Sequence, residues 1–312
     1  MTTILDIPGS SPPNPFTTPI QALLGPKISS TLTPTLEETA SHIVNSITNS
    51  SDPARSLWML WDAYFTSVVS STSHELHIAL LDALHARPPT QSDNLSSNSD
   101  AQRRLRSYTG ADDQINWQDL PRFHSQWRDV HDILEAWRDW DGVREPTADD
   151  SSTASTLDNS GETYFLRFCS FSAGLLKASK TESEVHPVCV FYACRKGLES
   201  HIPQSSQTKV HRMSSQQKWA LDIRIAAIWI RDGGRVLWEM DREELRRHWS
   251  AALDDQTELW SRKDGLTQKR WQLWADRLRD FSKAEAGLDE ETRTVAAEAA
   301  GVINSLLAES ST

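Results

Sequence analysis

Apolar residues recur at helical spacing along most of this chain, and this periodicity constrains the fold more than any other feature of the sequence. The clearest stretch runs from Phe123 to Trp137, where large apolar residues follow one another at steps of 4, 3, 4 and 3. Such steps place the side chains on one face of an α-helix. A second stretch, Trp219–Leu237, keeps similar steps through Gly233-Gly234, which predicts one long helix with a point of close approach. Because no segment shows sustained alternation with a period of two, we predict an all-α fold, a single array or bundle of about ten helices.

Signals for helix N-termini divide this pattern into elements. Thr35-Leu-Glu-Glu38 and Ser214-Ser-Gln-Gln217 have the form of a capping box, in which side chains and backbone N–H groups pair reciprocally. Asp52-Pro53 combines an N-cap residue with a proline at the first helical position. Thr72 is expected to cap the helix that follows. These signals predict where four of the helices begin.

Three segments of low complexity lie between the helical stretches. Residues 1–33 are rich in Pro, Ser and Thr, and we predict that they form a disordered tail. Residues 88–116 and 141–161 are rich in polar residues and are expected to be spacers without a regular structure. The sequence therefore predicts one helical domain over residues 34–309.

Charge and hydropathy exclude two classes of partner. The formal net charge is −11, and no stripe of Lys and Arg is present that could neutralise the phosphates of a nucleic acid. Uninterrupted apolar runs such as Ile225–Ile230 are much shorter than the roughly 20 apolar residues that a membrane-spanning helix needs. We therefore expect neither nucleic acid nor membrane as a partner.

The N-terminal sequence and the cysteines indicate the compartment. The first residues contain no basic segment followed by an apolar one, so they do not resemble a secretory signal. The three cysteines, Cys169, Cys189 and Cys194, are an odd and sparse set, which is typical of a reducing compartment. We expect a cytoplasmic or nuclear protein that is not secreted.

Three tryptophan motifs connect the chain to a known family. They are Leu57-Trp-Met-Leu-Trp-Asp62, Trp117-Gln-Asp-Leu-Pro121 and Arg270-Trp-Gln-Leu-Trp274. With their surroundings, from about residue 55 to 282, they resemble a fungal all-helical family known only as a domain of unknown function. The resemblance implies a soluble, helical, single-domain protein of filamentous fungi, in some cases encoded beside genes for specialised metabolites. It brings no catalytic residues to carry over to this chain.

Two segments suggest metal binding, and each also has a structural interpretation. Asp254-Asp-Gln-Thr-Glu258 has the Asp-Asp-x-x-Glu form that holds Mg²⁺ and diphosphate in helical terpene synthases. The second metal-binding helix of that class does not follow it, so we favour an exposed acidic turn. His74, His77 and His85 could share a helical face, but their spacing differs from that of zinc proteases.

The sequence also contains no nucleophile elbow, phosphate loop or dinucleotide fingerprint. We predict no metal, no cofactor and no catalytic residue.

Tryptophan is unusually frequent, with 13 Trp against 8 Phe, and it recurs as Trp-x-x-Trp at Trp58/Trp61, Trp137/Trp140 and Trp271/Trp274. Helix packing is the interpretation that we favour for most of these side chains. The alternative is a groove lined by Trp and Arg, which are the residues enriched at binding hot spots. The candidate binding residues are Trp58, Trp61, Asp62, Arg270, Trp271, Trp274 and Arg277.

These observations lead to two hypotheses about function. The first is a non-catalytic helical scaffold that binds a protein or an apolar small molecule in a groove lined by Trp and Arg, as an accessory component of specialised metabolism. The second is an accessory biosynthetic enzyme of a fungal metabolite pathway that uses Mg²⁺ at Asp254-Asp255. We favour the first hypothesis because the catalytic motifs are missing. The oligomeric state does not follow from the sequence.

Overall fold

The computed structural model describes residues 14–24, 34–92, 99–110, 112–140, 161–179, 184–203, 212–263 and 265–310. Within these ranges the chain forms twelve α-helices, three 3₁₀ helices and one small two-stranded sheet, which confirms the all-α prediction. None of the described helices is both long enough and apolar enough to cross a membrane. The chain divides into two compact units, Met1–Ala136 (unit 1) and Trp137–Thr312 (unit 2). The single domain over 34–309 stays a prediction, because it concerns whether the units fold together.

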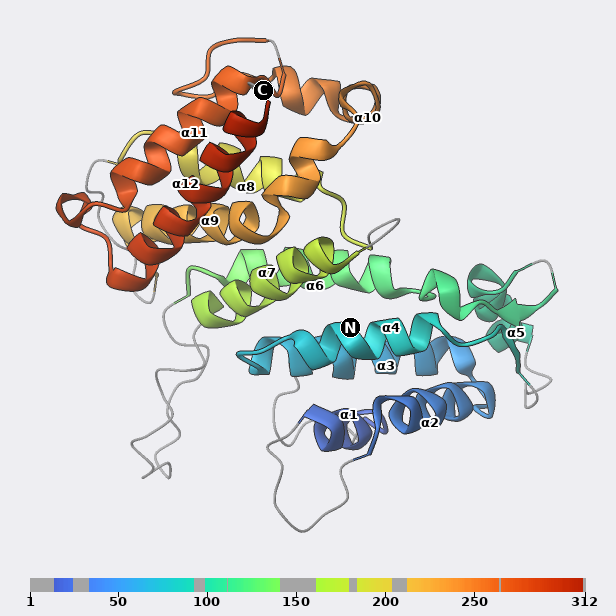
Figure 1. Ribbon diagram of the computed structural model, residues 1–312. Coiled ribbons are helices and arrows are strands. Elements are labelled where there is room, and N and C mark those ends of the chain that lie inside the picture. Colours follow the sequence, from blue (N-terminus) through green and yellow to red (C-terminus); the bar gives the residue numbers. More distant parts are fainter. Residues whose placement is uncertain are drawn as a thin grey trace, which may run out of the picture. The chain divides into compact units, whose positions relative to one another are not determined.

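Unit 1 is built around the long helix α3, which contacts α1, α2 and α5 (Figure 1). The helix α4 packs against α1, α2 and η2. The elements are α1 (Thr17–Leu24), α2 (Leu36–Thr48), α3 (Pro53–Ser70), α4 (Glu75–His85), β1 (Thr90–Gln91), α5 (Ser99–Leu105), η1 (Arg106–Tyr108), β2 (Gln114–Ile115), η2 (Trp117–Asp119) and α6 (Phe123–Trp137).

The helix α1 lies inside residues 1–33, which we expected to be a disordered tail. That prediction is wrong for Thr17–Leu24. Phe16, Ile20 and Leu23 are buried there, with exposed fractions of 2%, 0% and 6%. The proline-rich composition favoured disorder, although three apolar residues follow one another there at the helical steps of 4 and 3. The rest of the predicted tail, 1–13 and 25–33, lies outside the described residues.

Most of the predicted spacer at 88–116 also has structure. β1 and β2 pair antiparallel with Thr90 opposite Ile115, and α5 and η1 lie between them in the sequence. The indole N–H of the fully buried Trp117 donates a hydrogen bond to the Thr90 hydroxyl oxygen over 2.9 Å. Ala101 and Leu105 on α5 are buried as well. The prediction of an irregular spacer is therefore wrong for these elements, whereas residues 141–160 of the second spacer lie outside the described residues.

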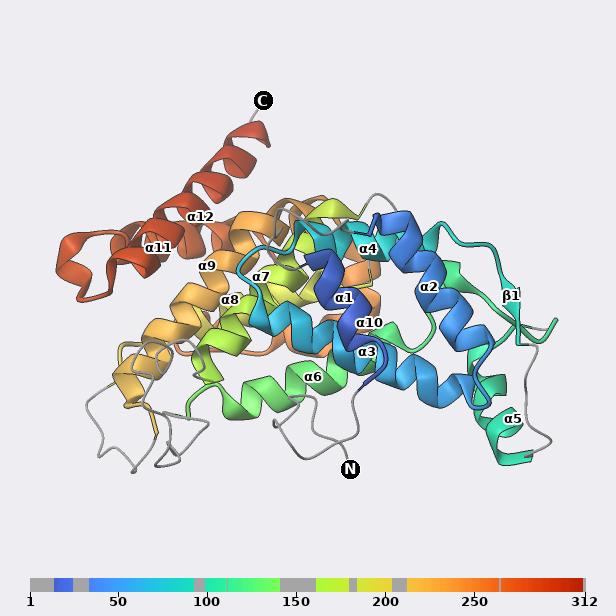
Figure 2. The ribbon, with the colours of Figure 1, turned by 90° about the horizontal axis from the view of Figure 1, so that it is seen from below.

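Unit 2 is organised around its longest helix, α9, which contacts α7, α8 and α12 (Figure 2). The helix α11 packs against α12 and α8. The elements are α7 (Gly161–Ala178), α8 (Val188–Leu198), α9 (Ser215–Glu239), α10 (Arg242–Asp254), α11 (Gln268–Phe281), η3 (Ala284–Ala286) and α12 (Glu290–Glu309).

The helix α9 is continuous through Gly233 and Gly234, as the apolar spacing predicted. A Cβ atom on Gly233 would lie 2.8 Å from the side chain of Leu176 on α7 and 3.0 Å from that of Val190 on α8. Real Cβ atoms essentially never approach other heavy atoms within 3.0 Å, so a glycine lets three helices meet at this point. The predicted close approach is therefore confirmed.

Three of the four predicted helix starts are confirmed. Both capping boxes form, with Thr35 and Ser214 as the N-cap residues of α2 and α9. Asp52 caps α3 and Pro53 opens it. The expected cap at Thr72 is wrong, because α4 begins at Glu75 after His74, whose side chain makes no cap hydrogen bond.

Candidate functional site

The seven candidate binding residues fall on two helices, one in each unit. Three lie on α3 in unit 1, and four lie on α11 in unit 2. Trp58 and Arg277 are half-buried, and the other five are buried. The buried members are Trp61, Asp62, Arg270, Trp271 and Trp274. Since the contacts of these five lie inside the protein, their direct role in binding stays a prediction.

Trp61 ties α3 to the turn that precedes α6. Its indole N–H donates a hydrogen bond to the carbonyl oxygen of Pro121 over 2.7 Å. Leu120 and Arg122, on either side of Pro121, have φ angles of 39° and 72°. This left-handed conformation costs a residue with a side chain about 1–2 kcal/mol. The hydrogen bond from Trp61 therefore helps to hold a strained turn, and it joins the first two tryptophan motifs of the sequence.

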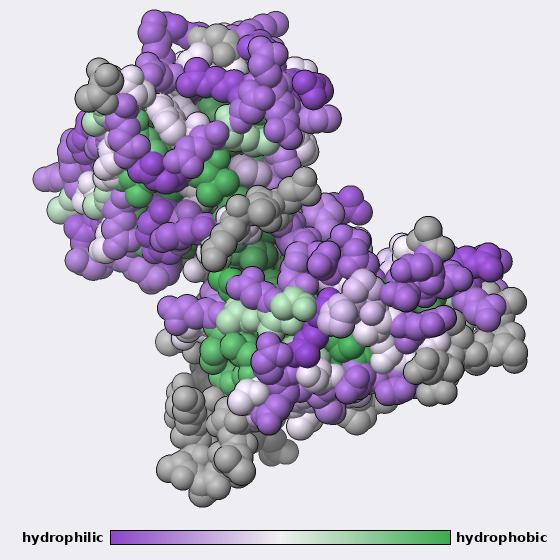
Figure 3. All heavy atoms as spheres, turned by 45° about the vertical axis from the view of Figure 1, so that its right-hand side comes forward, coloured by the Kyte–Doolittle hydropathy of each residue, from purple (hydrophilic) through white to green (hydrophobic). Residues whose placement is uncertain are grey.

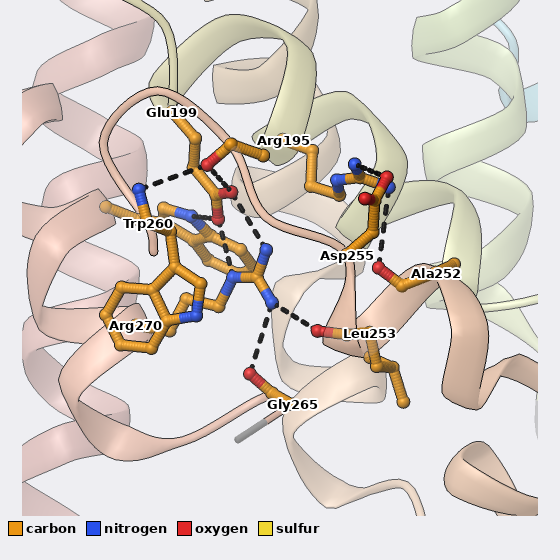
Figure 4. Close-up of polar contacts among 10 residues, drawn as sticks. Arg195, Glu199, Ala252, Leu253, Asp255, Trp260, Gly265 and Arg270 are labelled. Carbon is orange, nitrogen blue, oxygen red and sulfur yellow. Dashed lines mark hydrogen bonds and ion pairs between the residues drawn. The ribbon is translucent and has the colours of Figure 1, made fainter. Parts of the chain in front are cut away.

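Arg270 and Glu199 form an ion pair at the centre of the candidate site in unit 2 (Figure 4). Both side chains are 0% exposed. The Arg270 Nε atom lies 2.6 Å from Oε1 of Glu199, and Nη2 lies 2.9 Å from Oε2. This two-point contact matches the planar guanidinium to both carboxylate oxygens. Because either charge would be costly to bury alone, each residue depends on the other.

Arg270 also reaches the end of α10 and the loop that follows it. Its Nη1 atom donates to the carbonyl oxygens of Leu253, at 2.8 Å, and Gly265, at 3.2 Å. The guanidinium carbon lies 4.8 Å from the ring centroid of Phe191 and 5.4 Å from that of Trp260. Contacts of this kind between a guanidinium and aromatic rings are attractive. Arg270 on α11 thus joins α8, the end of α10 and the α10–α11 loop.

Glu199 is the residue that sequence reasoning missed. It follows α8 directly, and its carboxylate also accepts hydrogen bonds from the Trp274 indole N–H and the Thr257 hydroxyl, both over 2.8 Å. Its backbone carbonyl accepts from the Leu259 N–H over 3.1 Å. Glu199 belongs to no motif in the sequence. The available signal was indirect: Arg270 and Trp274 stand one turn apart on α11, so their polar groups can share one acidic partner.

A second arginine completes the attachment of α10. Arg195 on α8 donates to the carbonyl oxygen of Ala252, at 3.4 Å, and to the carboxylate of Asp255, at 2.6 Å. The last carbonyl groups of a helix have no partner within the helix, and cations are favourable beside them. Arg195 and Arg270 therefore cap the C-terminal end of α10 from two other helices.

The acidic segment at the C-terminal end of α10 does not gather its carboxylates around a common point. Each of the three carboxylates has its own partner, namely Arg246 for Asp254, Arg195 for Asp255 and the backbone N–H of His201 for Glu258. In the part of the chain that the structure describes, no group of three or more His, Cys, Asp or Glu side chains could hold a metal ion. The arrangement fastens the α10–α11 loop to α8.

Burial changes the pKa of three further groups. It raises the pKa of the Cys189 thiol to about 12, and it raises the pKa of Cys194 well above its usual range, where the charge of Glu199 adds to the effect. In unit 1, burial lowers the pKa of His77 to about 4, and the neighbouring His74 adds to this shift. The two thiols therefore stay protonated at neutral pH, which makes them poor nucleophiles.

Aromatic side chains gather on the surface beside this site. Tyr192 on α8 is 42% exposed, and its ring meets the half-buried Trp249 of α10 edge to face, with centroids 6.2 Å apart. The His186 ring lies 5.3 Å from the Trp249 ring. We call these three residues the α8–α10 aromatic surface. Most of the face shown in Figure 3 is hydrophilic, with apolar residues visible in patches. Within the α8–α10 aromatic surface Tyr192 is exposed, and Trp249 and His186 are half-buried.

The comparisons with known proteins identify a family. No curated protein and no solved structure matches the chain. Residues 61–278, more than two thirds of the 312 residues, match a family described as a protein of unknown function, DUF3632. The match includes Trp61, the turn at Pro121, Glu199 and Arg270, and it confirms the resemblance to a domain of unknown function. The chain belongs to the DUF3632 family.

Proposed function

We propose that this chain is a non-catalytic helical protein that binds a protein partner through the α8–α10 aromatic surface. The observation that carries the proposal is the edge-to-face pair of Tyr192 and Trp249, of which Tyr192 is 42% exposed. Tyrosine and tryptophan are enriched in interfaces and among the residues that dominate binding energy. We favour a protein over an apolar small molecule because these rings lie on outer helical surfaces, which a protein face can cover.

The buried ion pair supports this proposal by fixing the two helices that carry the rings. Glu199 follows α8, and Arg270 holds the C-terminal carbonyl of Leu253 on α10. A surface that is already ordered before binding loses less conformational entropy when a partner arrives. In this proposal Arg270, Trp271 and Trp274 of α11 support the binding surface from the interior, and they do not contact the partner.

The surroundings of the reactive groups also favour a non-catalytic role. A substrate has no access to the sealed Arg270–Glu199 pair, and the raised pKa values of Cys189 and Cys194 leave both thiols protonated at neutral pH. The Mg²⁺-dependent alternative rests on Asp254 and Asp255, whose carboxylates face different arginines. We therefore keep the binding role as the single proposal.

We also propose the setting in which this role is performed. The three cysteines are free, which fits a reducing compartment, and we propose the cytoplasm or the nucleus. A role beside enzymes of specialised metabolism follows from the family resemblance alone. Deleting the gene and profiling the metabolites of the host tests that part of the proposal separately.

Quantitative affinity capture with the full chain tests the binding role. The test variant is Tyr192→Glu, and the matched control is Leu76→Glu, because Leu76 lies in unit 1 with a similar exposure of 44%. We expect at least one protein from host extract to be retained by the wild type and by Leu76→Glu, and lost by Tyr192→Glu. Retention that does not depend on Tyr192 refutes the proposed surface. Thermal stabilisation by Mg²⁺ with diphosphate would favour the enzymatic alternative instead.

A further inference from the structure

The N-terminal helix α1 packs across three other helices of unit 1, and we call the surface that it covers the α1 groove. Its residues contact α2, α3 and α4 (Figure 2). Phe16, Ile20 and Leu23 enter this groove and are buried, whereas Thr18 and Gln21 on the outer side are exposed. The three helices beneath α1 thus form a surface whose apolar residues are covered by an eight-residue segment.

The pattern of the buried residues is that of a helical ligand. Phe16, Ile20 and Leu23 stand at positions i, i+4 and i+7, which lie on one face of a helix. The same spacing anchors short amphipathic helices in the grooves of proteins that recognise them. Residues 14–24 also contain no charged side chain. The groove therefore receives an uncharged helix with bulky apolar anchors.

The helical conformation of α1 depends more on its contacts with the groove than on the helix-forming tendency of its own residues. An isolated helix shorter than about 12–15 residues is marginal in water, so eight residues keep a helical conformation chiefly because they are docked. Asn14 fixes the start of α1, where its side-chain amide donates to the carbonyl oxygen of Met59 over 2.7 Å and its Oδ1 accepts from the Phe16 N–H over 3.0 Å. Three apolar anchors must offset the entropy of ordering the whole segment. Such a segment opens more easily than α3, which buries eleven of its eighteen residues, whereas α1 itself buries Ile20 and Leu23.

We propose that the α1 groove is a binding site for an amphipathic helix of a partner protein, and that α1 is its displaceable internal occupant. The partner helix carries bulky apolar residues at i, i+4 and i+7 on an uncharged face, because the resident helix has that chemistry. This site lies in unit 1 and is independent of the α8–α10 aromatic surface in unit 2.

Peptide binding to the full chain tests the proposal. The variant Ile20→Asp/Leu23→Asp places two charges at anchor positions and frees the groove, and Thr18→Asp/Gln21→Asp places two charges on the outer side of the same helix as the matched control. The probe is a fluorescein-labelled peptide with the sequence of residues 14–24, and binding is read by fluorescence anisotropy. If the groove of the wild type is open for one tenth of the time, freeing it strengthens binding about tenfold. We expect the wild type and the control to bind alike and the groove variant to bind more tightly. A groove variant with native near-ultraviolet circular dichroism that binds the peptide no better than the wild type overturns the proposal.

Hydrogen exchange of the wild-type chain provides a second test without a variant. The amide protons of α1 are expected to exchange faster than those of α3, and their protection gives the open fraction of the groove. The gain in peptide affinity of the groove variant should equal the inverse of this open fraction. Equal protection of α1 and α3 overturns the idea of a displaceable helix. A dimer that forms with rising concentration of the wild type, and that Ile20→Asp/Leu23→Asp abolishes, would assign the groove to α1 of a second copy and refute the partner helix.

Discussion

Replacing Glu199 by glutamine tests how much of unit 2 depends on the buried ion pair. Glutamine has nearly the same shape, but it carries no charge and leaves Arg270 as a cation with 0% exposure. Removing one partner of a buried pair costs about 3–5 kcal/mol, because the other charge stays buried without compensation. The Trp274 indole and the Thr257 hydroxyl, which both donate to the carboxylate, lose part of their hydrogen bonding as well. We therefore expect a loss near the upper end of this range.

The assay is thermal and urea unfolding at pH 7, followed by far-ultraviolet circular dichroism. For a unit of this size, 1 kcal/mol corresponds to about 2–4 °C, so Glu199→Gln is expected to lower the Tm by about 10 °C or more. The control is Asp276→Asn, which breaks the Asp276–Arg279 pair, whose side chains are about half exposed; such a pair contributes about 0–1 kcal/mol. If the free energy of unfolding of Glu199→Gln lies within about 1 kcal/mol of the wild-type value, the ion pair does not hold the site together and this reasoning is wrong.

Three further predictions concern other parts of the chain. His77 has a pKa of about 4 in the folded chain, below its usual 6.5. Its contribution to stability is therefore constant above pH 6.5 and falls by up to about 3 kcal/mol as the pH drops to 4. Urea unfolding midpoints between pH 7 and 4 should show this loss of stability, and the loss should be smaller in His77→Asn. Trp61→Phe removes the indole N–H that pairs with the Pro121 carbonyl and should cost about 1–3 kcal/mol in urea unfolding; an unchanged midpoint would mean that water takes over this bond. Gly233→Ala should destabilise the chain by about 1–3 kcal/mol through overpacking, whereas Gly301→Ala, with nothing within 4 Å of the added Cβ, should stabilise it by up to about 1 kcal/mol. Equal Tm shifts for the two glycine variants would contradict the close approach at Gly233.

The helices could be predicted because the residues that form them carry local signals. The capping boxes at Thr35 and Ser214 form as expected, and the continuous register through Gly233 gives one helix. Each of these features depends on side chains within a few residues of one another. The same reasoning failed for α1 and α5, because Pro- or Ser-rich composition was given more weight than a few apolar residues that become buried.

The contacts around the candidate residues of α11 were only partly accessible to sequence reasoning. Arg270 and Trp274 of the third tryptophan motif contact a buried carboxylate, and their role in binding stays a prediction. Glu199 stands 71 residues before Arg270, and nothing in its neighbourhood marks it. Candidates on α3 and α11 were grouped because they share tryptophan motifs, and the structure assigns them to different units.

The sequence by itself determined the all-α class, three of the helix starts and the membership in DUF3632, because periodicity, caps and motifs are properties of short segments. Only the tertiary structure decided which polar groups are buried together, where α1 docks and how the helices divide into two units. The physical reason is that a charge such as Glu199 enters the interior only when distant segments supply its partners at the same time. Those partners come from α11 and from the α10–α11 loop, which local spacing cannot bring together.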